Sequence, residues 1–167
     1  MARMSDYIRD RFSVEVRIVD AQAAFLGDLD GAEIRLGRGQ DAATALFTLG
    51  HLFGHTVQWN LSERARTIGG REEGRHSQAE LLEIEDYELE ASRYGLQLLH
   101  EIGVHDLDQW LSDFAACDLA YLEHFYTTGE RRTPAEFWKD GQPLLAPLPI
   151  PTFSPRRFKF RWEGVVI

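Results

Sequence analysis

The chain has a single cysteine, Cys117, among its 167 residues. One cysteine cannot form an internal disulfide and offers no cluster of thiolates to a metal ion, so a reducing compartment such as the cytoplasm is the expected setting. Any metal site in this chain must therefore be built from histidines and carboxylates. Because Cys117 lies in an apolar segment with no cation nearby in sequence, we expect it to be a small core residue.

Basic residues are also scarce: 18 lysines and arginines stand against 27 aspartates and glutamates, for a formal net charge of −9. This excess of negative charge gives no overall attraction to nucleic-acid phosphates and repels an anionic membrane surface. The sequence has no run of about 18 uncharged apolar residues, and its first residues lack the apolar centre of a signal peptide. We therefore expect a cytoplasmic protein that binds neither nucleic acid nor membrane.

The apolar pattern predicts a small sheet at the start of the chain. Residues 13–19 and 32–36 alternate apolar and polar side chains, as strands with one buried face do, and two or three short strands are expected. From residue 42 the period changes to three and four, after Asp41, a residue type that caps helix N-termini. This change predicts a helix over 42–59.

The middle of the chain is predicted to be mostly helical. Residues 62–77 are charged and contain several glycines, which is typical of a surface loop. Helical periodicity returns over 78–101, in one long helix or one with a single break. Another helix is predicted over about 107–126, with Asp106 or Asp108 as its cap.

The end of the chain has a different composition. Thr133 begins a capping-box pattern and opens a short helix. After Asp140 several prolines exclude a regular helix. The predicted fold class is α+β, with a short N-terminal sheet packed on a helical core over residues 1–140. A proline-rich, basic and aromatic tail over 141–167 is expected to pack on this domain or to dock a partner.

Two histidines, His51 and His55, form the most informative pattern of the sequence. Side chains four residues apart on a helix lie one above the other on the same face, so both imidazoles can reach one metal ion. Zinc accepts such nitrogens at about 2.0–2.1 Å, with a third protein ligand and a water in an open site. The acidic helix that follows offers four carboxylates for the third position: Glu83, Glu85, Glu88 and Glu90.

Around these residues the chain resembles the ImmA/IrrE-type metallopeptidases of the zincin group. The resemblance covers about residues 14–100, and the segments FTLGHLFGH and ELEASRYGLQLL carry it. In the family the first motif reads roughly F-T-L-A-H-E-L-G-H, and the second carries a glutamate followed by an alanine and an aromatic residue. The resemblance implies a small zincin-like fold with Zn²⁺ as cofactor. It assigns His51 and His55 as metal ligands and Glu88 as the third, with Glu85 as the geometric fallback.

Two positions depart from the family pattern. The glutamate after the first histidine, which takes a proton from the metal-bound water and passes it to the leaving amine, is replaced by Leu52. The acidic or amide residue of the second motif, which can orient a ligand histidine, is Ser92. The chain therefore lacks the usual general base, and the sequence assigns no catalytic residue.

Three functions are left open by these residues. The first is a zinc-binding pseudoenzyme, non-proteolytic or strongly impaired, that recognises a peptide or partner protein in a groove beside the site, in a regulatory setting by analogy with the family. The second is an active zinc-dependent metallopeptidase or hydrolase with another carboxylate as base: Glu85, Glu90, Glu72 or Glu73. The third is a metal-free interaction domain whose two motif histidines form hydrogen bonds in the core. The remaining histidines are expected to be structural: His76, His100, His105 and His124.

Overall fold

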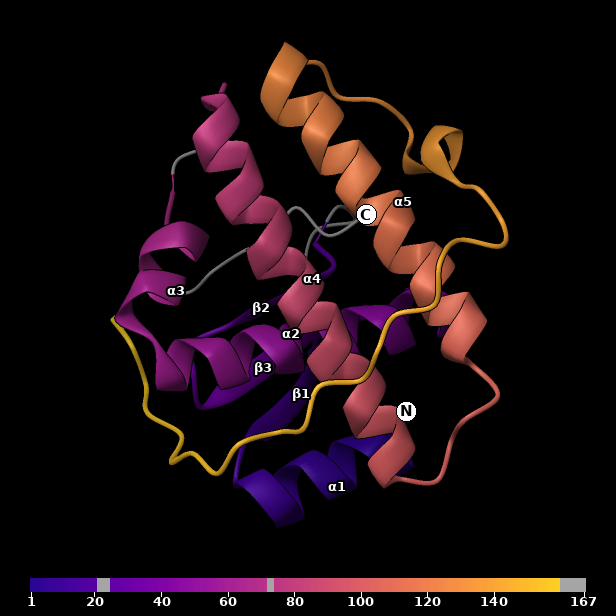
Figure 1. Cartoon of the computed structure of the whole chain (residues 1–167). Coiled ribbons are helices and arrows are strands. Elements are labelled where there is room, and N and C mark those ends of the chain that lie inside the picture. Colours follow the sequence, from indigo (N-terminus) through magenta and orange to yellow (C-terminus); the bar gives the residue numbers. More distant parts are fainter. Residues whose placement is uncertain (21–24, 72–73, 160–167) are drawn as a thin grey trace.

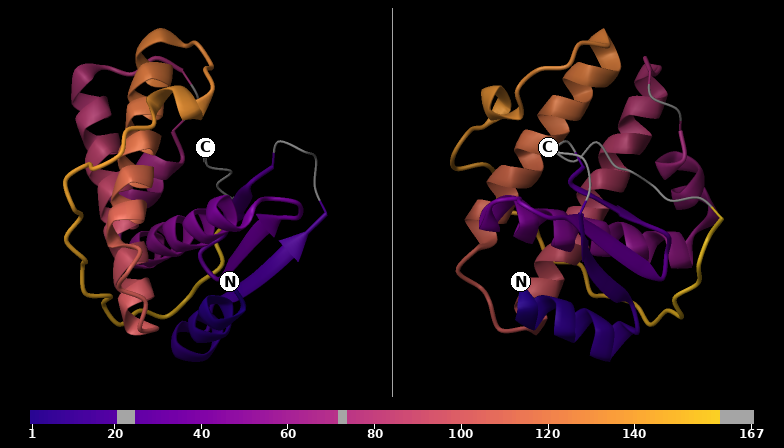
Figure 2. Two further views of the ribbon diagram at one scale, coloured as in Figure 1. Left: turned by 90° about the vertical axis from the view of Figure 1, so that its right-hand side faces the viewer. Right: turned by 180° about the vertical axis from the view of Figure 1, so that it is seen from behind.

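A small sheet, a central helix and a pair of long helices form three layers in the computed structural model (Figures 1 and 2). The structure describes residues 1–20, 25–71 and 74–159. Helix α2 (Ala42–Leu61) contacts the sheet on one side and α4 (Gln78–Glu101) on the other, and α5 (Asp108–Thr128) packs beside α4. The predicted α+β class is confirmed.

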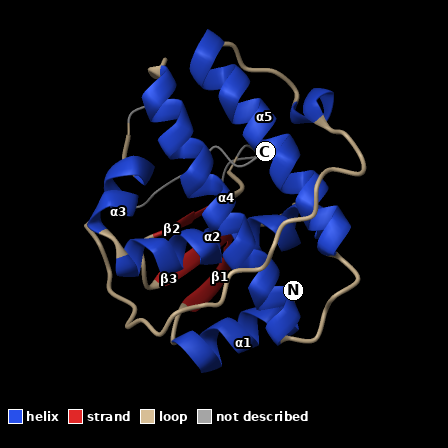
Figure 3. Cartoon of the chain, in the orientation of Figure 1, coloured by secondary structure: helices blue, strands red, loops and turns tan. Residues whose placement is uncertain are grey.

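The sheet has three strands in the order β1-β3-β2 (Figure 3). β3 (Glu33–Gly37) is central, parallel to β1 (Glu15–Val19) and antiparallel to β2 (Gly27–Leu29). The prediction of short strands before the helices is confirmed. β1 is an edge strand, and its Ile18 is 58% exposed, so the buried face expected for this strand is only partly formed.

An additional helix, α1 (Ala2–Phe12), precedes the sheet and was not predicted. Its buried residues, Met4, Ile8 and Phe12, recur every four residues and form a single apolar stripe. This stripe is narrow and stands among charged residues, so it gives only a weak signal in the sequence. The stripe contributes to the main core beneath the sheet.

The predicted helices α2 and α4 are confirmed, and their N-termini show why they begin where they do. The Asp41 carboxylate accepts hydrogen bonds from the backbone N–H groups of Ala43 and Thr44 at the start of α2. Ser77 and Glu80 form a reciprocal capping box at the start of α4, which runs unbroken.

Two local predictions are wrong. Residues 62–77 are not only a loop, because α3 (Glu63–Gly69) forms there, with the Ser62 hydroxyl accepting from the Ala65 N–H. Neither Asp106 nor Asp108 caps α5; the N-cap position is Leu107, which makes no side-chain capping bond. Both errors are local, since neither displaces a helix of the core.

Helices α2 and α4 cross at very short range. A Cβ atom built on Gly54 would lie 2.1 Å from the carbonyl oxygen of Ala91, so only glycine fits at this crossing. Gly50 lies one turn earlier on the same face of α2, where a Cβ would be 3.6 Å from the Cα atom of Gly95. The crossing brings the histidines of α2 against the acidic face of α4.

The chain after α5 forms one short 3-10 helix (Pro134–Phe137), opened by the predicted Thr133 capping box, and then runs without regular secondary structure to residue 159. It follows the outside of α4, where Arg93 donates to the carbonyl of Ala146 (Figure 1). Further on, the Phe158 N–H donates to the carbonyl of Asp30. The last part of the predicted tail, residues 160–167, lies outside the described residues. No described helix is long and apolar enough to span a bilayer.

Candidate metal centre

The three residues that the resemblance assigns as metal ligands meet in the structure. His51 and His55 project from α2 and Glu88 from α4. The two Nε2 atoms are 2.9 Å apart, and the Glu88 Oε2 lies 2.9 Å from Nε2 of His51 and 3.0 Å from Nε2 of His55. All three side chains are buried, with exposed fractions of 2%, 0% and 7%. The cluster is a group of histidine and carboxylate side chains that could hold a metal ion.

The size of this triangle suits a small cation. For a tetrahedral ion with bonds of about 2.0–2.1 Å, ligand atoms are about 3.3–3.4 Å apart. The observed edges of 2.9–3.0 Å are shorter by only a few tenths of an ångström. A slight outward shift of three side chains would therefore let one ion contact all three atoms, with a fourth position on the side away from the protein ligands.

The ring of His55 is oriented by Gln58, which lies three residues later on α2. The Gln58 amide nitrogen donates to the Tyr87 carbonyl and to the Glu90 carboxylate, so its oxygen faces His55. That oxygen is 2.8 Å from Nδ1 of His55, which must carry the hydrogen. The Nε2 atom beside the Glu88 carboxylate then carries either a second proton, which makes the ring a cation, or a lone pair. In the second case a metal cation between the two atoms would make the contact attractive.

His51 is held from two sides. Its Nδ1 lies 3.3 Å from the hydroxyl of Ser92, the residue that differs from the acid or amide of the resembling family motif. The Phe47 ring, one turn earlier on α2, stacks on the imidazole at 5.3 Å between centroids. These contacts direct Nε2 of His51 toward the other two ligand atoms.

Glu88 is held in its ionised form. Burial alone would raise the pKa of this carboxyl group, but the charge of His55 and the hydrogen bonds and charge of both histidines outweigh it and lower the pKa to about 2. An ionised carboxylate in a buried position is the form that binds a metal cation. The Glu88 carboxylate is therefore ionised at neutral pH, next to two imidazole rings.

The other carboxylates considered for the third position do not reach the cluster. Glu83 pairs with Arg64 and Arg71 on the surface. Glu85 is exposed on α4, and Glu90 contacts the cluster only through Gln58. The alternative bases Glu72 and Glu73 lie outside the described residues.

Leu52, at the position where the family that the sequence resembles has its general base, belongs to the apolar core. Its side chain is fully buried, and its Cδ1 lies against Gly27 of β2, where a built Cβ would approach it to 2.7 Å. The apolar side chain is thus part of the packing between α2 and the sheet. Position 52 supplies no proton acceptor.

Asp118 of α5 is a residue near the centre that the sequence interpretation missed. It is 2% exposed, and its Oδ1 has no hydrogen-bond partner among the described residues. Burial raises the pKa of Asp118 to about 7, with the charge of His51 lowering it and that of Glu88 raising it. Its sequence signal is that it shares one buried helix face with Leu111, Ala115 and Leu122, so an acid stands in an apolar stripe.

The four remaining histidines contact other parts of the molecule, away from this cluster. His100 bonds to Asp108 at 2.8 Å and packs on His105. His76 and His124 pack on aromatic rings of α5 and of the 3-10 helix. Cys117 is buried, and burial raises its thiol pKa to about 11, so it has the character of a core residue.

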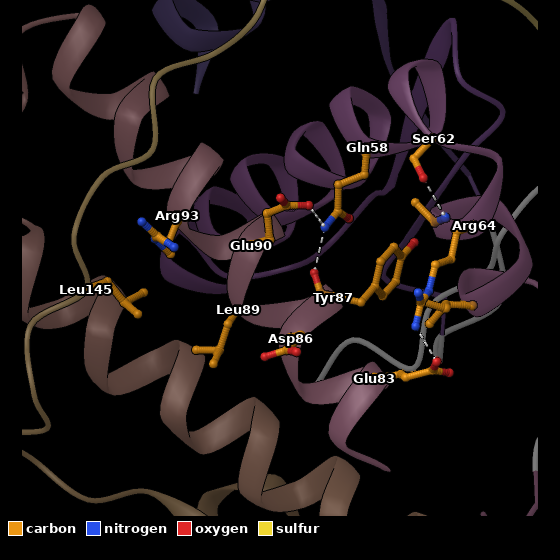
Figure 4. Close-up of a pocket in the computed structure, with 12 residues that line it drawn as sticks. Gln58, Ser62, Arg64, Glu83, Asp86, Tyr87, Leu89, Glu90, Arg93 and Leu145 are labelled. Atoms are coloured by element: carbon orange, nitrogen blue, oxygen red, sulfur yellow. Dashed lines mark hydrogen bonds and ion pairs between the residues drawn. The ribbon is translucent and has the colours of Figure 1, made fainter. Parts of the chain in front are cut away.

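A pocket of about 670 Å³ opens beside the centre, between α2, α3 and α4 (Figure 4). Its wall includes Gln58 and Tyr87, the residues that orient and stack on His55. Acidic and basic side chains share the rest of the lining, and Arg64 pairs with Glu83 across it. The lining therefore combines charged and apolar side chains, and Gln58 lies both in this wall and against His55.

No protein-family model matches the chain, and searches among curated proteins and among solved structures return no significant match. The comparisons thus leave the function to be argued from the site itself.

The Gln58 contact gives a direct test of how His55 is held. Gln58→Ala is expected to weaken zinc binding by about 10–100-fold, the usual effect of removing a group that orients a ligand histidine. Competition with a chromophoric chelator measures the affinity, and Gln97→Ala, on the part of α4 near Glu101, is the matched control. Unchanged affinity in Gln58→Ala would show that the ring is oriented by other contacts.

Proposed function

We propose that this protein is a zinc-binding, metallopeptidase-like protein that does not hydrolyse peptides. The convergence of two imidazole nitrogens and a carboxylate oxygen within 3.0 Å of one another carries the proposal. Two nitrogen donors and one oxygen donor form the ligand set of many zinc sites, and the short triangle suits a tetrahedral ion. When bound, zinc would act as a Lewis acid on a water or carbonyl oxygen.

Two features argue against peptide hydrolysis. Leu52 places an apolar side chain where a general base is needed. The ligand side chains are at most 7% exposed, so an extended peptide has no direct access to the ion in this conformation. These features support the pseudoenzyme over the alternative of an active zinc hydrolase.

The pocket beside the centre, with its charged and apolar lining, is the proposed binding site for a peptide segment of a partner protein. Its mixed charges suit peptide backbone and charged side chains, and Gln58 connects its wall to His55. Occupancy of the pocket and of the metal centre would then be coupled. A peptide library from which the zinc-loaded protein selects no sequence would contradict this part of the proposal.

Elemental analysis of protein purified without chelator or metal-affinity tag tests the proposal. About one zinc per chain is expected in the wild type, and none in a His51→Ala, His55→Ala double variant, because zinc sites need at least three good ligands. A His100→Ala, His105→Ala double variant is the control and should keep its zinc. Absence of zinc from the folded wild type would favour the metal-free interaction domain.

Activity is tested on the same preparations. The zinc-loaded protein is expected to leave an unfolded protein substrate intact over many hours. Cleavage that a chelator stops and that the His51→Ala, His55→Ala variant lacks would instead establish the alternative, an active metallopeptidase with another base.

A further inference from the structure

The third long helix, α5, brings a carboxylate to the metal centre. Phe114 of α5 stacks on Phe47 of α2, with 4.2 Å between ring centroids. Asp118 lies one helical turn after Phe114 on α5, and His51 lies one turn after Phe47 on α2. Each therefore lies on the same helix face as the stacked phenylalanine before it. The ring stack thus brings this part of α5 against the helix that carries His51, and the charges of His51 and Glu88 both act on the Asp118 carboxyl group.

Asp118 is not itself a member of the histidine and carboxylate cluster. The ligand atoms of His51, His55 and Glu88 are all within 4.8 Å of one another, and Asp118 is outside this group. A water in the fourth position of a zinc ion extends the centre by about 2 Å, and an acceptor then lies about 2.6–3.2 Å from the water oxygen. An Asp118 carboxylate that faces the fourth position would contact such a water.

The Asp118 Oδ1 needs a donor that the described residues do not supply. It is buried, the residue being 2% exposed, and it has no hydrogen-bond partner among them. Buried carboxylate oxygens are nearly always hydrogen-bonded, and an exception calls for a water or an ion. A metal-bound water meets this need because the cation makes its hydrogens better donors.

We propose that Asp118 is a positioning residue of the metal centre, whose Oδ1 accepts a hydrogen bond from the water that completes the coordination of the ion. The proposal rests on the proposed function, since it needs an ion held by His51, His55 and Glu88. The carboxylate that contacts the water then comes from α5, and not from position 52 of α2.

The test uses Asp118→Asn, which keeps the shape of the side chain and removes its charge. Zinc affinity is measured by chelator competition, and azide binding to the Co²⁺-substituted protein is followed by visible absorption. The variant is expected to bind zinc about tenfold more weakly and azide about tenfold more tightly, because a negative charge next to the water position attracts the cation and repels the anion. The metal-free variant is expected to melt at a higher temperature at pH 8, since it removes a buried charge whose Oδ1 has no hydrogen-bond partner among the described residues.

Asp113→Asn is the matched control. Asp113 is a buried aspartate on the same helix, but its Oδ1 accepts from Gln109 and from the Gln142 N–H. Its variant should melt at a lower temperature and keep both affinities within about twofold of the wild type.

Other results would overturn the inference. Zinc and azide affinities of Asp118→Asn equal to those of the wild type would show that Asp118 is only a buried core residue. If azide binds to Asp118→Asn but not to the wild type, Asp118 itself binds the metal ion at the position assigned to the water. Two further results would overturn the proposed function as well: a wild-type protein that binds no zinc, or a His51→Ala variant that still binds it. Both are measured before Asp118 is changed, so they can be told apart from a failure of the inference about Asp118.

Discussion

Replacing Gly54 by alanine is expected to lower the free energy of unfolding by about 3 kcal/mol, the upper part of the range for overpacked interiors. The new methyl group would lie 2.1 Å from the Ala91 carbonyl oxygen and 2.6 Å from the Ala91 Cα, both backbone atoms of α4. Backbone cannot rotate away as a side chain can, so the two helices must separate. Zinc affinity should fall in parallel, because His51 and His55 lie on one helix and Glu88 on the other. Chemical denaturation of the metal-free protein and chelator competition measure the two effects.

Gly50→Ala is the control for the same helix. A Cβ at this position would be 3.4 Å from the flexible end of Met4 and 3.6 Å from Gly95, both ordinary contacts. Alanine also favours a helix over glycine by about 1 kcal/mol, so this variant should be as stable as the wild type or slightly more so. Equal stability of Gly54→Ala and Gly50→Ala would show that the crossing is looser than the structure has it.

The pairing of His51 and His55 could be predicted from the sequence because its geometry is local. The spacing of His51 and His55 fixes both on one helix face whatever the rest of the chain does. Spacing alone did not identify Glu88, because α4 offers four candidate carboxylates. The match to the family motif selected Glu88 from the four. The structure places Glu88, and none of the other three, against both histidines.

Other parts of the centre depend on tertiary packing and carry little local signal. In the sequence, nothing distinguishes Gln58 from other polar residues of a helix. Its role depends on contacts with α4, where the Tyr87 carbonyl and the Glu90 carboxylate orient its amide group. Asp118 is thirty positions from Glu88, and only its apolar neighbours on α5 hint that it is buried. The helices α1 and α3 were missed for a related reason, since both are short and their apolar faces are narrow.

Leu52→Glu is expected to lower the free energy of unfolding by about 4 kcal/mol or more, without creating peptidase activity. Leu52 is fully buried among apolar side chains and lies against Gly27 of β2. A carboxylate there loses its hydration and finds no hydrogen-bond donor in the apolar cluster, so several kcal/mol of solvation are lost. Denaturant unfolding of the metal-free protein at pH 8, where a glutamate is normally ionised, measures the loss.

Leu52→Met separates the effect of charge from that of shape. Methionine has nearly the volume of leucine, and such exchanges usually cost less than about 1.5 kcal/mol. A Leu52→Glu protein as stable as Leu52→Met, with cleavage of an unfolded substrate that a chelator stops, would show that position 52 faces the bound water. The Asp118 carboxylate of α5 would then not be needed to contact that water. Loss of stability without activity is the result expected if the side chain at position 52 serves the core and Asp118 serves the metal centre.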